Sequence, residues 1–323
     1  GTALTDQASN ATAGGFPLTV LQSFVTTATN TWSSATSSYT TGLSSYPVSS
    51  GSGGLVWIKN RGSSNHTLYN TASGSGKYLS SNTTSAQTTN AQTLTSFTPS
   101  GFVLGNDALV DGNTFNFVSW TFRKQAKFFD IVTYTGNGAT SRTINHNLGV
   151  TPGLMFVKAV GASGNWICNG SNTGNGNVIL NSSGVGNAVA ATNGYIDLLS
   201  STSFRVAAGY PSGTIVTDVN ASGVTYIAYL FGNGGGGFGA SGTDSAIVCG
   251  SYVGNGLAAG PTVTLGFEPQ WVMVKNTSST GGWMIEDILR GMSVTSANAL
   301  YANATTPEAA FNPSIIPNAT GFS

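Results

Sequence analysis

Val56-Trp57-Ile58-Lys59 returns in this chain as Met155-Phe156-Val157-Lys158 and again as Val272-Met273-Val274-Lys275. A second stretch, residues 130–138, returns as residues 248–256. A repeat of about 100–120 residues has the size of one small domain and not of a solenoid turn. The repetition therefore predicts tandem domains, which supply length or valency, whereas an enzyme usually needs one asymmetric site.

The repeat and its linkers divide the chain of 323 residues into four parts. We predict a Ser/Thr-rich segment or degenerate repeat at 1–50, a first repeat at 51–126, a second at 127–238 and a truncated third at 243–323. Within the first part, residues 18–25 predict one short helix or strand. The joint at 50–54 and the linker at 232–239 are rich in Gly and Ser and predict flexible joints, whereas the linker at 123–127 is short and charged.

Short strands are the main local signal inside each repeat. They are rich in β-branched and aromatic residues and are bounded by Gly, Asn and Ser. In the second repeat they are expected at 129–134, 154–160, 165–168, 178–180, 203–207 and 224–231. The distances Leu79–Phe102, Leu180–Phe204 and Leu300–Phe322 are 23, 24 and 22 residues, which aligns the three leucines. The predicted fold class is all-β, with tandem antiparallel β-sandwich (jelly-roll-like) repeats.

Charge is scarce in this chain. Asp, Glu, Lys and Arg make up 7% of the residues and the net charge is zero, against about 25% charged residues in ordinary soluble domains. A neutral surface has no field to attract a polyanion or an anionic membrane. We therefore predict neither a nucleic-acid partner nor membrane insertion, and no run of about 18 apolar residues predicts a transmembrane helix.

The ends and the cysteines give further expectations. The chain has no initiator Met and its third repeat ends early, which predicts a processed chain or a fragment. Cys168 and Cys249 align with Ile285 and Ile131 of other repeats. A cysteine in place of isoleucine is most simply a small buried hydrophobe, so both thiols are expected to be unpaired.

Few residues offer catalytic or metal-binding chemistry. His66 and His146 lie among turn-forming residues and are expected to be exposed. Adjacent Glu286 and Asp287 would point to opposite faces of a strand, which makes them a poor glycosidase pair. Asp107 and Asp111, with Asn106 and Asn113, form an Asx-rich turn or offer oxygens to a hard cation. We predict no catalytic residue, no cofactor and no metal; the glycine run at 232–239 lacks the Lys-Ser/Thr of a phosphate loop.

The repeated lysine and its aromatic neighbours have two interpretations each. Lys59, Lys158 and Lys275 are expected to be strand-end lysines whose ammonium groups reach water, with an active-site lysine as the alternative. Trp166 and Trp283 stand eight residues after their lysines, where the first repeat has Thr67. They either pack in a core or stack on sugar rings. We predict that any glycan or partner contact falls in the loops at 61–69, 161–175 and 276–292, which hold His66, Trp166 and Trp283.

Several stretches resemble a known family. Residues 57–61, 77–84, 96–102 and 119–125, together with 134–138 and 266–270, resemble a domain repeated in structural proteins of marine tailed phages. The resemblance covers residues 54–323. It implies a tail fibre or another virion appendage, and this family supplies no catalytic residue to carry over.

The function expected from these observations is structural and non-enzymatic. The chain would lie on the virion surface, assemble as a homo-oligomer, with a trimer preferred by family analogy, and contact other virion proteins and a host surface glycan. A cell-surface adhesin or an array of carbohydrate-binding modules is the alternative. A glycan-degrading enzyme is a third reading, which would need a carboxylate cluster in one groove.

Overall fold

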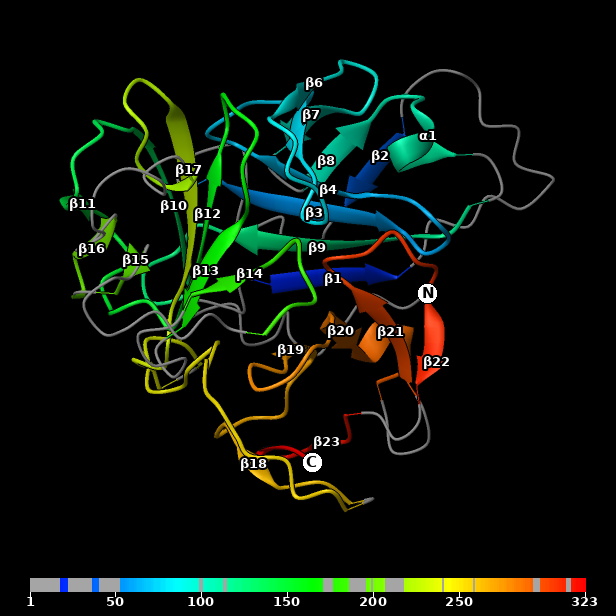
Figure 1. Ribbon diagram of the computed structural model, residues 1–323. Helices are drawn as coiled ribbons and strands as arrows, with labels where there is room; N and C mark the ends of the chain where they lie inside the picture. The colour runs from blue at the N-terminus through cyan, green and yellow to red at the C-terminus, as the bar shows by residue number, and fades with distance from the viewer. Residues whose placement is uncertain are drawn as a thin grey trace.

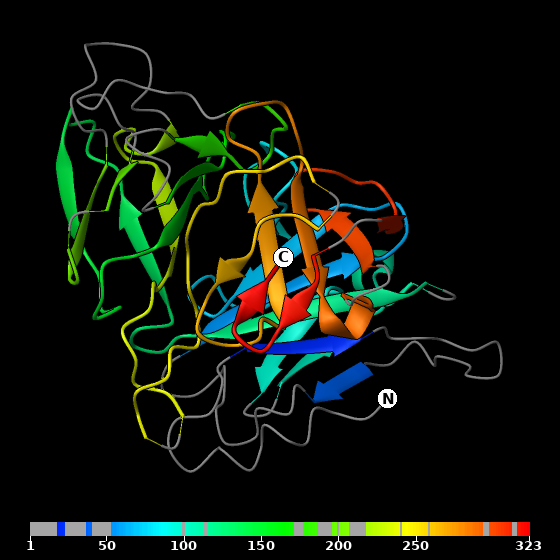
Figure 2. The same ribbon diagram turned by 90° about the horizontal axis from the view of Figure 1, so that it is seen from below.

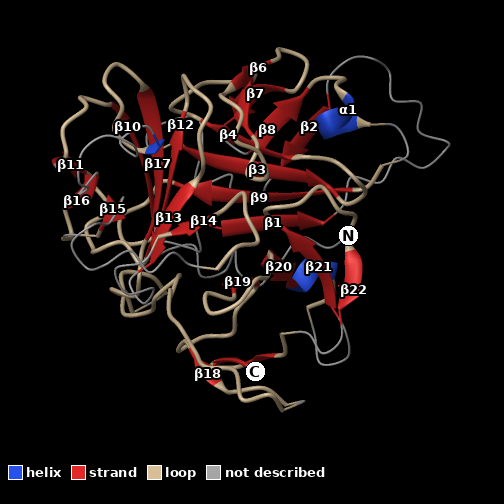
Figure 3. Ribbon diagram, viewed as in Figure 1, coloured by secondary structure: helices blue, strands red, loops and turns tan. Residues whose placement is uncertain are grey.

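The structure is a computed structural model, and almost all of its regular elements are strands (Figure 3). It describes residues 18–22, 37–40, 53–98, 101–112, 115–170, 177–185, 196–198, 200–206, 218–239, 241–257, 259–292, 297–311 and 315–323. The helices whose bounds fall within these ranges are short: α1 (Ala108–Asp111) and the 3-10 helix η3 (Ile288–Arg290). No helix in these ranges is long and apolar enough to cross a membrane.

The first unit is built from two antiparallel sheets. The larger sheet has the order β1 (Leu18–Gln22), β9 (Phe117–Arg123), β3 (Gly54–Asn60), β4 (His66–Asn70), β5 (Lys77–Leu79) and β6 (Thr88–Thr89). The smaller sheet has the order β2 (Ser37–Thr40), β8 (Gly101–Leu104) and β7 (Leu94–Thr98). Because β1 and β2 belong to these sheets, the first sandwich begins before residue 51. The expected short element at 18–25 is a strand over Leu18–Gln22.

The second and third units repeat this plan. In the second unit the larger sheet has the order β10 (Phe129–Thr135), β17 (Thr225–Phe231), β12 (Leu154–Ala159), β13 (Ile167–Gly170) and β14 (Val178–Ile179). Its smaller sheet has the order β11 (Arg142–Asn145), β16 (Ser203–Val206) and β15 (Ile196–Asp197). In the third unit the larger sheet has the order β19 (Trp271–Lys275), β20 (Trp283–Asp287), β21 (Ala297–Tyr301) and β22 (Ala309–Phe311). Its smaller sheet has the order β18 (Val263–Thr264), β24 (Gly321–Phe322) and β23 (Pro317–Asn318). The predicted all-β class of antiparallel sheets is confirmed.

Each unit has its own apolar core between its two sheets. In the first unit Val56 and Ile58 of β3 point into this core, where they meet Phe102 and Leu104 of β8. The corresponding residues of β12, Met155 and Val157, fill the core of the second unit. Alternate residues of a strand point to opposite faces, so half of each repeated tetrapeptide is used inside its own sandwich.

The other half of the tetrapeptide builds a fourth core that all three units share. We call this the central core; its buried residues include Trp57, Trp120 and Phe122 of the first unit, Phe156, Trp166 and Tyr229 of the second, and Trp283, Ile285 and Leu300 of the third. Figure 1 shows the three units grouped around it, and Figure 2 shows the same grouping from below. Apolar residues on both faces explain why β3 is buried along its whole length.

The glycine-rich linker between the second and third units, expected to be a flexible joint, follows a turn that depends on glycine. Four consecutive glycines, residues 234–237, all have φ between 59° and 97°, a region that only glycine enters at little cost. Lys127 Nζ donates to the carbonyl of Gly235 at 2.9 Å. The turn ends at Phe238, which is buried in the central core.

Candidate functional site

The three predicted contact residues occupy one position in the three units. On β4, His66 lies opposite the repeated lysine of β3, and on β20, Trp283 lies opposite the repeated lysine of β19. The register of β12 with β13 places Trp166 in the same relation to its lysine. The counterpart of the two tryptophans is therefore His66 and not Thr67, because the first unit has a loop one residue shorter.

All three side chains lie inside the molecule. His66 and Trp166 have no exposed surface, and Trp283 is 5% exposed. The expectation that His66 lies in an exposed turn is wrong, since it is the first residue of β4. His146 is also buried, against expectation, and its ring lies parallel to that of Phe204 with 6.3 Å between centroids.

The ring nitrogen of each of these residues is hydrogen-bonded to a carbonyl of the neighbouring unit. The pairs are Trp166 Nε1 to Ser80 O at 2.8 Å, Trp283 Nε1 to Ile179 O at 3.0 Å, and His66 Nε2 to Tyr301 O at 3.0 Å. The three acceptors occupy equivalent positions in their units. In each unit, the second residue after that unit's own ring residue pairs with a residue on the next strand, and the residue that follows this partner supplies the acceptor carbonyl. The second unit thus contacts the first, the third contacts the second, and the first contacts the third.

A second set of hydrogen bonds repeats the same cycle. The residue two positions before each ring residue donates its backbone N–H to a second carbonyl of the neighbouring unit. This carbonyl belongs to the residue four positions after the acceptor of the first set. The pairs are Gly164 N to Thr84 O at 2.8 Å, Gly281 N to Ser183 O at 2.8 Å, and Ser64 N to Thr305 O at 3.0 Å. A head-to-tail contact that returns to its starting unit after three steps forms a closed ring. One chain therefore forms a pseudo-threefold ring, with three equivalent contacts that we call the junctions.

An asparagine positions the ring residue at every junction. The side-chain oxygens of Asn82, Asn181 and Asn303 accept hydrogen bonds from the backbone N–H groups of His66, Trp166 and Trp283, at 3.1, 2.8 and 2.7 Å. Sequence reasoning missed these residues. Each asparagine comes three residues after Leu79, Val178 or Leu300, so Val178 and not Leu180 is the true counterpart of the two leucines.

Each repeated lysine donates from Nζ to the loop that precedes the ring residue of its own unit, and Lys158 and Lys275 also donate to a carbonyl of the neighbouring unit. Nζ of Lys59 donates to Gly62 O at 2.7 Å, and Nζ of Lys158 donates both to Gly164 O at 2.9 Å and to Thr84 O of the first unit at 3.0 Å. Lys59 and Lys158 are fully buried, which contradicts the expectation that their ammonium groups reach water. Burial lowers the pKa of each to about 8.

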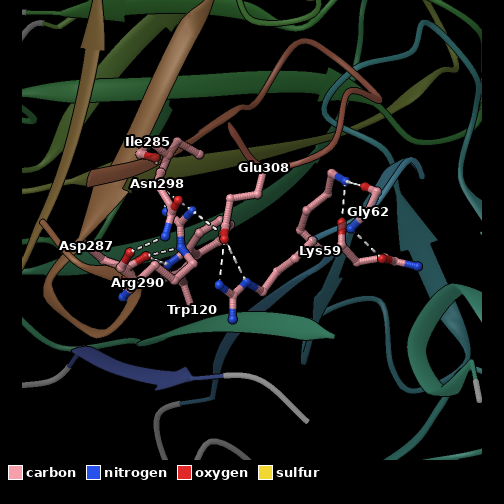
Figure 4. A network of polar contacts seen from close by, with 10 residues as sticks. Lys59, Gly62, Trp120, Ile285, Asp287, Arg290, Asn298 and Glu308 are labelled. Carbon is pink, nitrogen blue, oxygen red and sulfur yellow. Dashed lines mark hydrogen bonds and ion pairs between the residues drawn. The ribbon is translucent and has the colours of Figure 1, made fainter. Parts of the chain in front are cut away.

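Buried charges distinguish the junction between the first and third units (Figure 4). Nε of Arg61 in the first unit donates to Glu308 of the third at 2.9 Å, and Glu308 also accepts from Nη1 of Arg290 at 3.1 Å. Arg290 is fully buried and forms an ion pair with Asp287 at 2.6 Å. Trp120 Nε1 donates to Asp287 at 3.2 Å, and the guanidinium carbon of Arg290 lies 5.5 Å from the Trp120 ring centroid.

The adjacent acids on β20 point to opposite faces, as the sequence predicted. Asp287 belongs to this charged network, whereas Glu286 points into the third unit and accepts from Ile315 N at 3.2 Å. Burial raises the pKa of Glu286. The two carboxylates therefore contact different groups and do not face one common opening.

The Asx-rich loop and the cysteines have structural contacts. Asp107 caps α1 by accepting from Leu109 N at 2.8 Å, and it also accepts from Asn90 at 2.7 Å. Asn113 lies outside the described residues. Cys168 and Cys249 are free thiols, and Cys168 lies in the central core at the position of Ile285. Within the described ranges no three His, Cys, Asp or Glu side chains come together as a metal site.

A family comparison covers all three units. The pattern of one family, described as a domain of unknown function (DUF7483), matches residues 24–322. The chain belongs to the DUF7483 family. The matched range runs through parts of all three units without a break. Searches of curated proteins and of solved structures find no match to this DUF7483 chain.

The His66 junction of this DUF7483 chain is expected to weaken in acid. Trp57 Nε1 donates to His66 Nδ1 at 2.9 Å, so Nδ1 carries no proton and Nε2 donates to Tyr301 O. Burial, with a smaller effect from Lys59, lowers the His66 pKa to about 3. The unfolded chain, with a histidine pKa of about 6.5, binds more protons between these values. Stability is therefore full above pH 6.5 and is lost as the pH falls towards 3, by up to about 1.4 kcal/mol per pH unit.

Urea unfolding at pH 7, 6, 5 and 4 measures this loss. His66→Gln keeps one acceptor and one donor at every pH, so its unfolding free energy should fall less steeply than that of the wild type over this range. Carboxylates contribute equally to both proteins and cancel in the comparison. Equal slopes for the two proteins would show that His66 is not the acid-sensitive group.

Proposed function

We propose that this protein is a non-enzymatic structural protein of a virion, a tail fibre or another appendage, that presents surface for host attachment or links virion components. The observation that carries the proposal is the closed ring of three junctions. The residues that recur in every unit are used to hold the units together. A rigid body of repeated sandwiches is suited to building a particle or to presenting loops on it.

The surface composition supports the same proposal. The chain has 11 basic and 11 acidic residues among 323, and the ion pairs Arg61–Glu308 and Arg290–Asp287 lie inside the first–third junction. An uncharged polar surface associates with other proteins without stripping water from ions, which costs several kcal/mol per ion. We propose other virion proteins, further copies of this chain as a homo-oligomer with a trimer preferred, and a host surface glycan as partners.

The structural proposal is favoured over an array of carbohydrate-binding modules. Sugar rings stack on aromatic faces that are open to solvent, and the indoles of Trp166 and Trp283 are covered by neighbouring units. Their contact partner in the structure is the same chain. A host glycan would instead bind the exposed parts of the loops around these residues.

Particle labelling tests the proposal. Antibodies raised against the purified protein are applied to density-purified phage particles from the source culture, and bound antibody is located by immunogold electron microscopy. We expect gold at the tail or another appendage, with peptides of this chain in the particle digest. Antiserum pre-adsorbed with the protein is the control. Label confined to cells, with no peptide in the particles, would overturn the proposal.

A further inference from the structure

The strand β10 lies at one end of the larger sheet of the second unit and pairs with β17 on one side. Gly136 N, directly after β10, donates to Val224 O at 2.8 Å, so the even-numbered residues of this strand face β17. Successive residues of a strand direct their backbone groups to opposite sides. The N–H and C=O groups of residues 129, 131, 133 and 135 therefore form the outer edge of β10.

The sequence of β10 makes this outer edge prone to pairing with another strand. Residues 131–135 read Ile-Val-Thr-Tyr-Thr, which are all β-branched or aromatic and include neither a charge nor a proline. A short uncharged segment of this kind on a sheet edge is a template for strands of other molecules. Thr133 and Thr135 are exposed, so the outer edge reaches solvent.

Neighbouring groups already occupy the first half of the outer edge. Gln125 of the linker exchanges two backbone hydrogen bonds with Phe129, at 2.9 and 3.0 Å. Asp130 Oδ1 accepts from Ile131 N at 2.8 Å and forms an ion pair with Lys124 Nζ at 3.0 Å. Lys124 Nζ also donates to Ile131 O at 3.5 Å. Both backbone groups of Ile131 are therefore covered by charged side chains.

Arg142 of β11 covers the other end of the outer edge. Its Nη1 donates to Thr135 O, and its guanidinium carbon lies 5.7 Å from the centroid of the Tyr134 ring. Within the described ranges, Thr133 is the one residue of this edge that has no hydrogen bond on the outer side. Only 22 of the 323 residues are charged (11 basic and 11 acidic), and three of them cover this one edge.

The third unit caps an equivalent backbone group with an uncharged side chain. Lys124 and Asn233 both stand two residues after the last phenylalanine of a repeated strand, β9 or β17, and Ile131 aligns with Cys249. Asn233 Oδ1 accepts from Cys249 N at 2.9 Å. The same N–H group is thus capped in both units, by a charged pair in one and by an amide in the other.

We propose that Lys124, Asp130 and Arg142 guard the outer edge of β10 against strand pairing with a second copy of this chain. A strand of a second copy would have to displace these side chains and bury their charges, which is costly. Copies of the chain in a homo-oligomer therefore meet at other surfaces. This inference goes beyond the proposed function, because it concerns the purified protein wherever that protein resides.

Two double variants that differ in one side chain test the guard. Lys124→Ala/Asp130→Val removes the charged pair and leaves the Ile131 N–H uncapped. Lys124→Asn/Asp130→Val removes the same charges but introduces the residues that the third unit has at these positions, Asn233 and Val248. Backbone hydrogen exchange of the full chain is followed by mass spectrometry over an about hundredfold range of protein concentration.

Exchange in residues 131–135 of the alanine variant should slow about tenfold or more as the protein concentration rises, because pairing with a second copy protects the edge. The wild type and the asparagine variant should show no such change. Equal protection in both double variants would overturn the proposal, since lost charge and not the open N–H would then cause association. Concentration-dependent protection in the wild type would also overturn it.

A single variant covers the case in which the double variants do not fold. Arg142 is half-buried, so Arg142→Ala should fold, and it opens Thr135 O beside the unpaired Thr133. We expect the same slowing of exchange at residues 133–135, at higher protein concentration than in the alanine double variant. Circular dichroism identifies the folded variants. If neither Arg142→Ala nor a folded alanine double variant gains protection with concentration, the proposal is wrong.

Discussion

Replacing Trp166 with alanine is expected to lower the free energy of unfolding by about 3–5 kcal/mol. The indole is fully buried in the central core and lies parallel to Tyr229 with 6.1 Å between ring centroids. Its Nε1 group donates to Ser80 O of the first unit at 2.8 Å. The substitution therefore leaves a cavity where two units meet and also leaves a junction carbonyl without its donor.

Urea unfolding at pH 7 measures the effect, and two variants isolate its parts. Trp166→Phe keeps most of the apolar volume and loses the donor, so it should cost about 1–3 kcal/mol. Phe115→Ala removes an aromatic ring that is 46% exposed, and surface changes of this kind stay within about 0.5 kcal/mol. A loss below about 1 kcal/mol for Trp166→Ala would mean that the indole is not part of the central core.

Removing the buried guanidinium of Arg290 should have a comparable effect. Arg290→Met leaves the Asp287 carboxylate buried beside Trp120 without its cation and frees the carbonyls of Ile285 and Asn298. An uncompensated buried charge costs about 3–5 kcal/mol. The half-exposed pair Arg205–Asp197 is the matched control, and Arg205→Met should cost at most about 1 kcal/mol.

A double variant tests the cause of this loss. Asp287→Asn keeps an acceptor for Trp120 Nε1 and removes the charge. In the Arg290→Met background it should therefore recover more than half of the lost stability. If the double variant is as unstable as Arg290→Met alone, the single variant's loss of stability comes from lost packing of the arginine stem and not from the unpaired charge of Asp287.

The repeated tetrapeptides predicted the strands β3, β12 and β19, because a strand buried on both faces needs an unbroken apolar run. Shorter strands gave less signal. The strand β11 (Arg142–Asn145) alternates polar and apolar residues in a turn-rich stretch and was not predicted. β2 (Ser37–Thr40) carries only Ser, Tyr and Thr, and it is a strand because β8 pairs with it.

The junctions could not be predicted from the pattern of one unit. Lys158 is a typical exposed strand-end lysine by sequence, and it is buried because Thr84 of another unit covers it. His66 and the two tryptophans share an aromatic ring with an N–H donor, which is the one signal that pointed to a common role. A loop shorter by one residue hid this equivalence, since counting from the lysine pointed to Thr67.

The order of the junctions around the ring determines how the molecule bears load. Neighbouring units in the chain are joined by a linker as well as by a junction and the central core, whereas the first and third units have no linker between them and meet at the central core and at the junction with Arg61 and Glu308, 247 residues apart. The buried ion pairs lie at this one contact. A pulling force on the two chain ends must break this contact first, because the chain connects its two sides only through the residues between Arg61 and Glu308. The ring therefore resists extension as one body until this contact opens, while separate sandwiches on a string would yield one by one.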